Sequence, residues 1–285
     1  MHDDVAKQDL TPTMKTRRLS TFLFLLACSA PALAQTPDER SAARALVKKH
    51  GDAVVTLLGT VKTRMMLGGK EMPANEEHLE TNGTVLDATG LTVISLTALE
   101  PGNLLGGIMS QGMESAGLSG MKIDTKTETT ELRLRLADGK EVPARVVLRD
   151  EDLDLAFVKP VEPLGAPLAF VDGPSGKPVA LDLLVGLTRL GPMAGWQVGA
   201  TFSHVVAVID KPRTAYLGGA GLGGAVFDGA GRFVGISVVS KRSGGAPSMS
   251  FTSMMSGNME GMGFMPIVLP ADEVREVAKQ ASVRK

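Results

Sequence analysis

Short apolar runs separated by turn residues extend along most of the chain. Val, Leu, Ile, Phe and Thr gather in these runs, and Gly, Asp and Pro punctuate them, which predicts short strands. The predicted strands cover residues 53–62, 83–87, 91–96, 130–136, 142–148, 153–159, 179–187, 196–209, 225–227, 233–239 and 264–269. The dipeptides Asp138-Gly139 and Asp172-Gly173 suit tight turns. Many short strands with few helices predict an all-β protein.

Two helices and two long loops complete the predicted elements. Residues 38–50 place apolar side chains on one side of a short helix. Pro270 begins a closing helix over residues 271–281, in which the apolar positions again follow helical spacing. Residues 101–121 and 241–263 are rich in Gly, Met and Ser, and we expect both to be surface loops.

The N-terminal segment carries a targeting signal. Basic residues at 15, 17 and 18 precede the apolar run Phe22–Ala27, and Ala32-Leu33-Ala34 offers small residues for cleavage before Gln35. This pattern predicts a secretory signal peptide, and hence a periplasmic or secreted protein. The apolar run is shorter than the roughly 18 residues of a membrane span. Whether Met1 or Met14 is the true start stays open, because the basic region begins directly after Met14.

Cys28, the single cysteine of the chain, lies inside this signal. Leu25-Leu26-Ala27-Cys28 is an imperfect lipoprotein cleavage site, so a lipid anchor at Cys28 is the less favoured alternative. Cleavage after Ala34 would leave a mature protein without a thiol. We therefore expect no disulfide, no metal–thiolate site and no cysteine catalysis.

The composition narrows the classes of partner. The 285 residues include 30 Lys and Arg against 31 Asp and Glu, a balance that does not favour nucleic acid as a partner. Hydrophobic residues make up 44% of the chain but aromatic residues only 4%, so aliphatic side chains must build the core. The length allows one or two domains.

Four blocks, in order along the chain, carry a resemblance to a known family. A strand, an Asp-Ala-x-Gly turn and a second strand run from Gly83 to Ala98. Residues 131–141 and 153–159 follow, then the glycine-rich segment 221–236, and finally Gly263–Ile267. Together these blocks resemble the trypsin-like serine proteases of the HtrA/Deg type.

This resemblance implies two six-stranded antiparallel β-barrels with a short C-terminal helix. We expect an N-terminal extension and signal peptide over residues 1–34, a first barrel with a Gly/Met-rich loop over 35–165, and a second barrel with a Met-rich loop and the helix over 166–285. We expect no PDZ domain of the kind that usually follows in this family, because the resemblance covers nearly all of the residues after the signal peptide.

The resemblance places the catalytic triad on residues that cannot perform its chemistry. Thr97 stands at the position of the histidine and Leu222 at that of the serine, while Asp154 retains the residue type of the aspartate. Leucine cannot attack a carbonyl and threonine is not a general base near neutral pH. We therefore expect a pseudoprotease that acts by binding a protein or peptide, with no cofactor.

The segment around the missing serine could still bind a ligand. The resemblance makes Gly221, Gly223 and Gly224 the equivalents of the oxyanion loop, and the Gly223-Gly224 turn could hold a carbonyl or a peptide carboxylate. We also expect Asp154, buried without a charged partner, to tolerate Asp154→Asn near pH 7, because the amide avoids the cost of burying an unpaired charge.

An active protease with a displaced site is the main alternative. Ser203 and His204 are neighbours, but adjacent strand residues point to opposite faces and cannot share a proton without distortion. His50 and His78 lie in polar stretches and have no second ligand at metal spacing, so we expect no zinc site.

Methionines interleaved with Gly and Ser leave three interpretations open. They could fill gaps over the barrel, or form a pliable apolar surface for a partner. A third interpretation is a Cu(I) site formed by thioethers, for which the candidates are Met254, Met255 and Met259.

Overall fold

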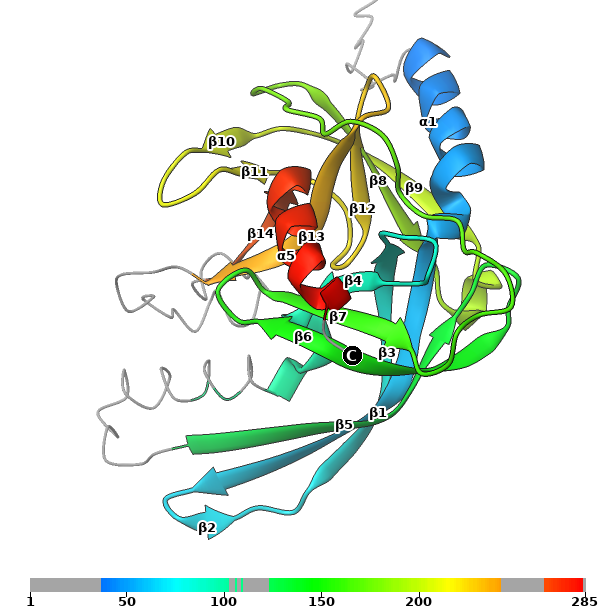
Figure 1. Ribbon diagram of the computed structural model, residues 1–285. Coiled ribbons are helices and arrows are strands. Elements are labelled where there is room, and N and C mark those ends of the chain that lie inside the picture. Colours follow the sequence, from blue (N-terminus) through cyan, green and yellow to red (C-terminus); the bar gives the residue numbers. More distant parts are fainter. Residues whose placement is uncertain (1–36, 103–105, 107–108, 110–122, 242–263, 284–285) are drawn as a thin grey trace, which may run out of the picture. The chain divides into compact units, whose positions relative to one another are not determined.

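The strands of the protein form two sheets of seven strands each (Figure 1). The computed structural model describes residues 37–102, 106, 109, 123–241 and 264–283.

The first sheet closes into a six-stranded antiparallel barrel. Its strands follow the order β2-β1-β3-β4-β7-β6-β5, and β1 also pairs with β5, which joins the two ends of the sheet. β2 is a short hairpin partner of β1 outside this ring. The strands are β1 (Val54–Leu67), β2 (Lys70–Glu71), β3 (Asn75–Val85), β4 (Thr92–Ser95), β5 (Ile123–Arg135), β6 (Glu141–Asp150) and β7 (Leu155–Pro160).

The second sheet forms a half-barrel. Its order is β10-β11-β14-β13-β12-β8-β9. Two residues, Val205 and Val206, separate β9 from β10, and the N–H of Val206 donates to the carbonyl of Leu217 in β11. The continuous segment β9–β10 therefore connects both ends of the sheet. The strands are β8 (Leu183–Arg189), β9 (Val198–His204), β10 (Ala207–Ile209), β11 (Ala215–Leu217), β12 (Ala225–Asp228), β13 (Phe233–Lys241) and β14 (Phe264–Pro270).

Short helices accompany the two sheets. The main ones are α1 (Pro37–His50), the turn α2 (Leu96–Leu99) and the closing helix α5 (Ala271–Val283), with 3-10 turns η1 (Gly51–Ala53) and η2 (Pro192–Ala194). The predicted helices at 38–50 and 271–281 are confirmed. The all-β fold class with a short C-terminal helix is confirmed as well, with the first barrel closed and the second a half-barrel.

The carboxylate of Asp87 stabilises the turn between β3 and β4. One carboxylate oxygen of Asp87 accepts the N–H of Thr89 at 2.8 Å, the Thr89 hydroxyl at 2.6 Å and the N–H of Leu91 at 3.2 Å. Gly90, with φ of 90°, takes the left-handed conformation that this turn needs. The Asp87–Gly90 turn therefore directs the chain from β3 into β4.

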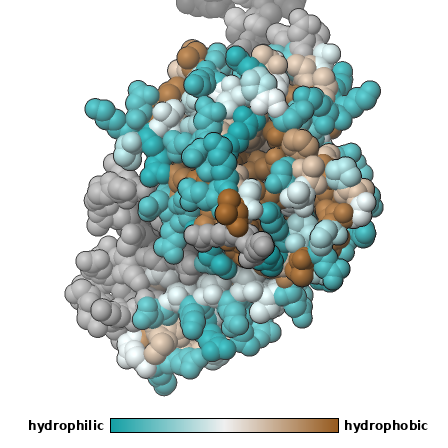
Figure 2. Space-filling view, viewed as in Figure 1, coloured by the Kyte–Doolittle hydropathy of each residue, from teal (hydrophilic) through white to brown (hydrophobic). Residues whose placement is uncertain are grey.

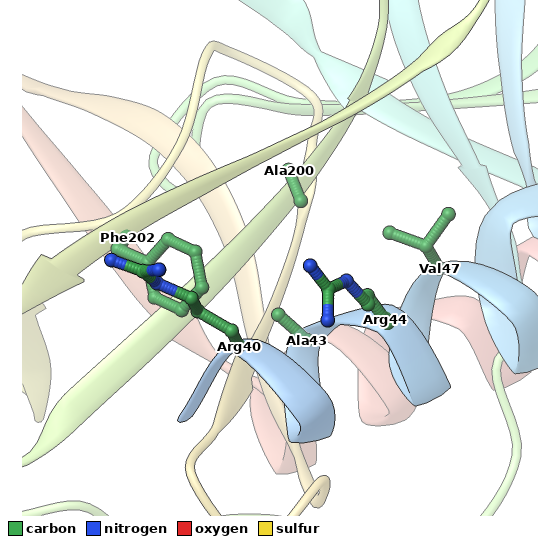
Figure 3. Close-up of a pocket in the computed structure, with 6 residues that line it drawn as sticks. All are labelled: Arg40, Ala43, Arg44, Val47, Ala200 and Phe202. Carbon is green, nitrogen blue, oxygen red and sulfur yellow. The ribbon is translucent and has the colours of Figure 1, made fainter. Parts of the chain in front are cut away.

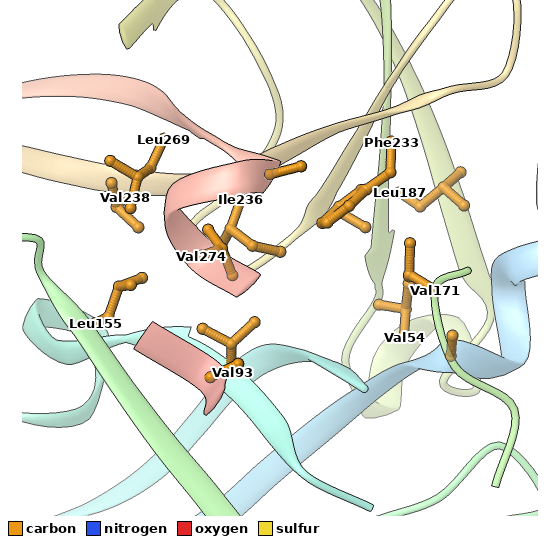
Figure 4. Close-up of a cluster of buried hydrophobic side chains, with 14 of the residues drawn as sticks. Val54, Val93, Leu155, Val171, Leu187, Phe233, Ile236, Val238, Leu269 and Val274 are labelled. Atoms are coloured by element: carbon orange, nitrogen blue, oxygen red, sulfur yellow. The ribbon is translucent and has the colours of Figure 1, made fainter. Parts of the chain in front are cut away.

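One apolar core extends across both sheets (Figure 4). Val93 and Leu155 from the first sheet, and Ile236 and Leu269 from the second, belong to a single cluster that Val274 of α5 also joins. The face in Figure 2 is mostly hydrophilic and carries smaller hydrophobic patches. Burial of these aliphatic side chains is the main force that holds the two barrels together.

Three strands are longer than the sequence predicted. β1 continues to Leu67, β3 already begins at Asn75 and β5 at Ile123, and β1 pairs with both neighbours along this extension. The expectation of a loop over 101–121 is wrong for the residues described there, since Pro101, Gly102, Gly106 and Met109 are helical. β8 begins at Leu183 rather than at 179, after Leu181 takes a left-handed φ of 73°.

A buried arginine joins the second barrel to the start of the first. Arg189 of β8 is 9% exposed, and its guanidinium donates to the carbonyls of Val54 at 2.7 Å, Gly51 at 2.9 Å and Trp196 at 2.9 Å. Its own N–H donates to the side-chain oxygen of Asn82 in β3 at 2.5 Å. Burial lowers the pKa of Arg189, yet a guanidinium stays charged at neutral pH, so these carbonyls balance a permanent cation.

Arg189→Met should therefore destabilise the protein by about 2–4 kcal/mol, because three carbonyls lose their charged donor, two of them in buried hydrogen bonds. Urea denaturation followed by circular dichroism measures this. Arg133→Met is the matched control, since Arg133 is half exposed and pairs with Glu141 at 3.6 Å; it should change the free energy of unfolding by less than about 1 kcal/mol. Equal effects of the two variants would contradict the bridging role of Arg189.

His50, expected in a polar stretch, is instead buried at the end of α1. It is 2% exposed, its ring stacks on Phe227 at 4.8 Å, and its Nδ1 has no hydrogen-bond partner among the described residues. Burial lowers the pKa of His50 from 6.5; Lys49 lowers it further, and Asp172 opposes both. The folded state therefore binds this proton less readily than the unfolded state.

The free energy of unfolding should fall as the pH drops below about 6.5, by at most about 1.4 kcal/mol per pH unit. The cause is that His50 binds a proton more readily in the unfolded chain than in the folded protein. Melting temperatures of the wild type and of His50→Gln between pH 7.5 and 5 test this. The variant should lack this part of the pH dependence. His78→Gln, which changes an exposed histidine of β3, should retain it. Parallel pH profiles of the wild type and His50→Gln would disprove the assignment.

Candidate functional site: a buried carboxylate at the barrel junction

The carboxylate of Asp154 is held by three hydrogen-bond donors. Oδ2 accepts the hydroxyl of Ser95 at 2.6 Å and the N–H of Val239 at 2.8 Å, and Oδ1 accepts the N–H of Thr97 at 2.7 Å. Asp154 is 3% exposed. The expectation of an uncompensated carboxylate is therefore wrong, since charge-assisted hydrogen bonds replace the missing cation.

The backbone conformation of Asp154 and the capping role of Ser95 together hold the carboxylate in place. Asp154 lies in the turn between β6 and β7 with a left-handed φ of 56°, a conformation in which Asp and Asn are enriched. Ser95 ends β4 and caps α2, because its hydroxyl accepts the N–H of Ala98 at 3.3 Å while it donates to Asp154. The carbonyl of Asp154 accepts the N–H of Leu96 at 2.9 Å. The carboxylate and the start of α2 thus fix each other.

The glycine segment before β12 uses its backbone N–H groups internally. Gly223 donates to the carbonyl of Ser237 at 2.8 Å, and Gly224 donates to that of Gly221 at 3.0 Å. The N–H of Ser237 in turn donates to the carbonyl of Gly224 at 3.2 Å. The Gly223-Gly224 turn therefore has neither N–H left for a ligand carbonyl, which corrects the expectation that it could bind one.

Gly223 lies against the first barrel too closely for any other residue. Its φ is 74°, and a Cβ there would collide with the carbonyl oxygen of Asn82. Its own carbonyl accepts the hydroxyl of Thr84 at 3.0 Å. The glycine is thus required for packing between the barrels.

β13 connects the three triad-equivalent positions. Ser237 binds the segment that contains Leu222, and Val239, two residues further along β13, binds Asp154. Thr97 meets Asp154 through its backbone N–H. Thr97 and Leu222 are both half-buried. The arrangement contains a carboxylate and backbone amides, but its triad-equivalent positions supply neither a nucleophile nor an imidazole.

Other candidates from the sequence lie elsewhere. The hydroxyl of Ser203 donates to the carbonyl of Gly219 at 3.3 Å and accepts its N–H at 3.1 Å, while His204 is exposed. None of the three histidines within the described ranges hydrogen bonds a serine. The Cu(I) candidates Met254, Met255 and Met259, and Cys28, lie outside the described residues and stay predictions.

The described residues contain neither a cluster of metal ligands nor a helix that could span a membrane. The described residues contain no group of three or more His, Cys, Asp or Glu side chains that could hold a metal ion. No helix among them is both long enough and apolar enough to cross a membrane.

Sequence reasoning did not identify Ser95, Val239 or Arg189 as parts of this junction. A serine directly before a short helical turn is a signal for a cap, and it could have been noticed at Ser95. Val239 contributes only its backbone N–H, which no residue pattern reveals.

The strand pairing and the closing helix define an antiparallel all-β fold of two sheets, the architecture that the sequence resemblance implied. No protein-family model and no curated protein matches the chain. Among solved structures, it is similar to an HtrA-type protease, AlgW, solved with a tripeptide. The identity is 17%, the TM-score is 0.49, and the match covers 83% of this chain and 62% of that one. The chain thus spans less than two thirds of the length of that structure.

Asp154→Asn should destabilise the protein by about 1–3 kcal/mol. The amide NH₂ replaces a carboxylate oxygen that accepts a hydrogen bond, so two donors then face each other. Asn tolerates the left-handed conformation as well as Asp does, so backbone strain cannot cause the loss. Chemical denaturation measures it. Asp152→Asn, an exposed neighbour, is the control and should stay within about 0.5 kcal/mol of the wild type. A neutral Asp154→Asn would show that the three donors do not depend on the charge.

Proposed function

We propose that this chain is a secreted homologue of the trypsin-like serine proteases that lacks peptidase activity and acts by binding a peptide or protein. The observation that carries the proposal is the state of Asp154. Its carboxylate accepts the hydroxyl of Ser95 and the backbone N–H groups of Val239 and Thr97, and no histidine of the described residues hydrogen bonds it.

The chemistry of peptide cleavage requires parts that these positions lack. A triad needs a nucleophile, a base that accepts its proton and a carboxylate that orients the base. Leu222 has no nucleophilic atom, and the hydroxyl of Thr97 cannot take up a proton near neutral pH. Loss of the nucleophile or the base alone costs on the order of 10⁶ in kcat in a serine protease.

The displaced-site alternative gains no support from the described residues. Ser203 shares its hydroxyl with Gly219, His204 points to solvent, and His50 is stacked on Phe227 inside the core. The secretory part of the proposal rests on the N-terminal residues 1–34, and the Cu(I) alternative rests on the Met-rich residues 241–263.

The purified protein should neither cleave casein nor form an adduct with a fluorophosphonate probe, which labels serines activated by a base. Trypsin, labelled in parallel, is the positive control. Leu222→Ser should remain unlabelled, since no base activates the new hydroxyl. An adduct that a single Ser→Ala change abolishes would replace this proposal with the active, displaced site.

A further inference from the structure

A groove of about 300 Å³ lies between α1 and β9 (Figure 3). Four of its six lining residues come from two consecutive turns of α1, and two come from one face of β9. They are Arg40, Ala43, Arg44, Val47, Ala200 and Phe202. None of the triad-equivalent positions lines it, so the inference that follows does not rest on the proposed function.

The floor of the groove is apolar. Ala43 is buried and Val47 is half-buried on α1, while Phe202 is half-buried on β9. Ala200 is exposed two residues before Phe202, on the same face of the strand. The small side chains of the two alanines leave a hollow in which one large apolar side chain of a ligand would replace water.

The rim of the groove is cationic. Arg40 and Arg44, one helical turn apart, extend from α1 toward β9 (Figure 3) and are both exposed. Among the residues that the structure describes, neither one forms an ion pair or a side-chain hydrogen bond. Lys48 continues the same row one turn further and is also exposed. Other arginines, such as Arg149 with Glu100 at 2.9 Å, pair within the protein.

The C-terminal half of α1 is held in place beside the groove. His50 stacks on Phe227, and Lys49 pairs with Asp172 at 3.1 Å. Gly51 lies so close to Val198 of β9 that a Cβ there would come within 3.3 Å of the valine. A groove with a fixed wall binds a ligand with little loss of conformational entropy.

From this combination we infer that the α1–β9 groove binds an acidic peptide segment of another protein. A large apolar side chain of the segment enters the hollow, and neighbouring carboxylates pair with Arg40 and Arg44. The volume lies at the lower end of the roughly 300–1,000 Å³ of ligand pockets and suits one or two side chains. A concave floor favours such a segment over a membrane surface, which would meet the arginines but could not fill the hollow.

Phage display of random heptapeptides on the purified full chain tests the inference. Enriched peptides should combine Phe, Leu or Trp with adjacent Asp or Glu. The same peptides, synthesised with a fluorescein label, should bind in an anisotropy assay and weaken as salt rises. Arg40→Ala with Arg44→Ala should lower their affinity about tenfold. Ala200→Trp, which fills the hollow from an exposed position, should also prevent binding.

Matched controls separate loss of the groove from loss of charge or fold. Lys70→Ala with Lys140→Ala removes two exposed cations from the first barrel and should leave binding unchanged. Thermal melts of every variant should coincide with that of the wild type. Failure to enrich acidic peptides, or binding that survives Ala200→Trp, would overturn the inference. Binding to phosphatidylglycerol vesicles that depends on the two arginines, without peptide enrichment, would assign the surface to a membrane instead.

Discussion

The carboxylate of Asp154 is buried with no cation paired to it in the described structure, so the O–H of Ser95 and the N–H groups of Thr97 and Val239 must balance its charge. Two of these donors belong to the first barrel and the third belongs to β13 of the second. Because a buried charge is costly unless it is fully hydrogen bonded, the carboxylate is satisfied only when the two barrels lie in this arrangement. Asp154 therefore has a structural role at the junction of the two barrels.

Two further side chains, those of Thr84 and Arg189, also join the two barrels through hydrogen bonds to backbone groups. The hydroxyl of Thr84 reaches the carbonyl of Gly223, and the guanidinium of Arg189 reaches those of Gly51 and Val54. Each contact joins a side chain to the backbone, so it constrains the path of the chain rather than the identity of a second side chain. Apolar burial supplies most of the stabilising free energy, and these directional bonds select one arrangement of the barrels.

Hydrophobic periodicity predicted the elements that face the core and failed where no core exists. β4 and β7 alternate or concentrate aliphatic residues and were found within a few positions of their true ends. The outer half of β5 reads Asp124 to Glu131 without one apolar residue, so its strand pairing with β1 left no apolar signal. The surroundings of Asp154 were equally hidden, because its donors lie 57 to 85 residues away along the chain. The resemblance located the aspartate, but only the fold shows how its charge is balanced.

The junction and the groove on α1 share a common support. α1 ends at His50, and the next residue, Gly51, offers its carbonyl to Arg189, which also holds Val54 at the start of β1. The helix is therefore anchored at its C-terminal end to the same seam that Asp154 stabilises. Its first turns, with Arg40 and Arg44, extend from that anchor along β9. A ligand in the groove would contact a wall whose position is set by the junction of the barrels, because the contacts that hold the two sheets together also hold the C-terminal end of α1.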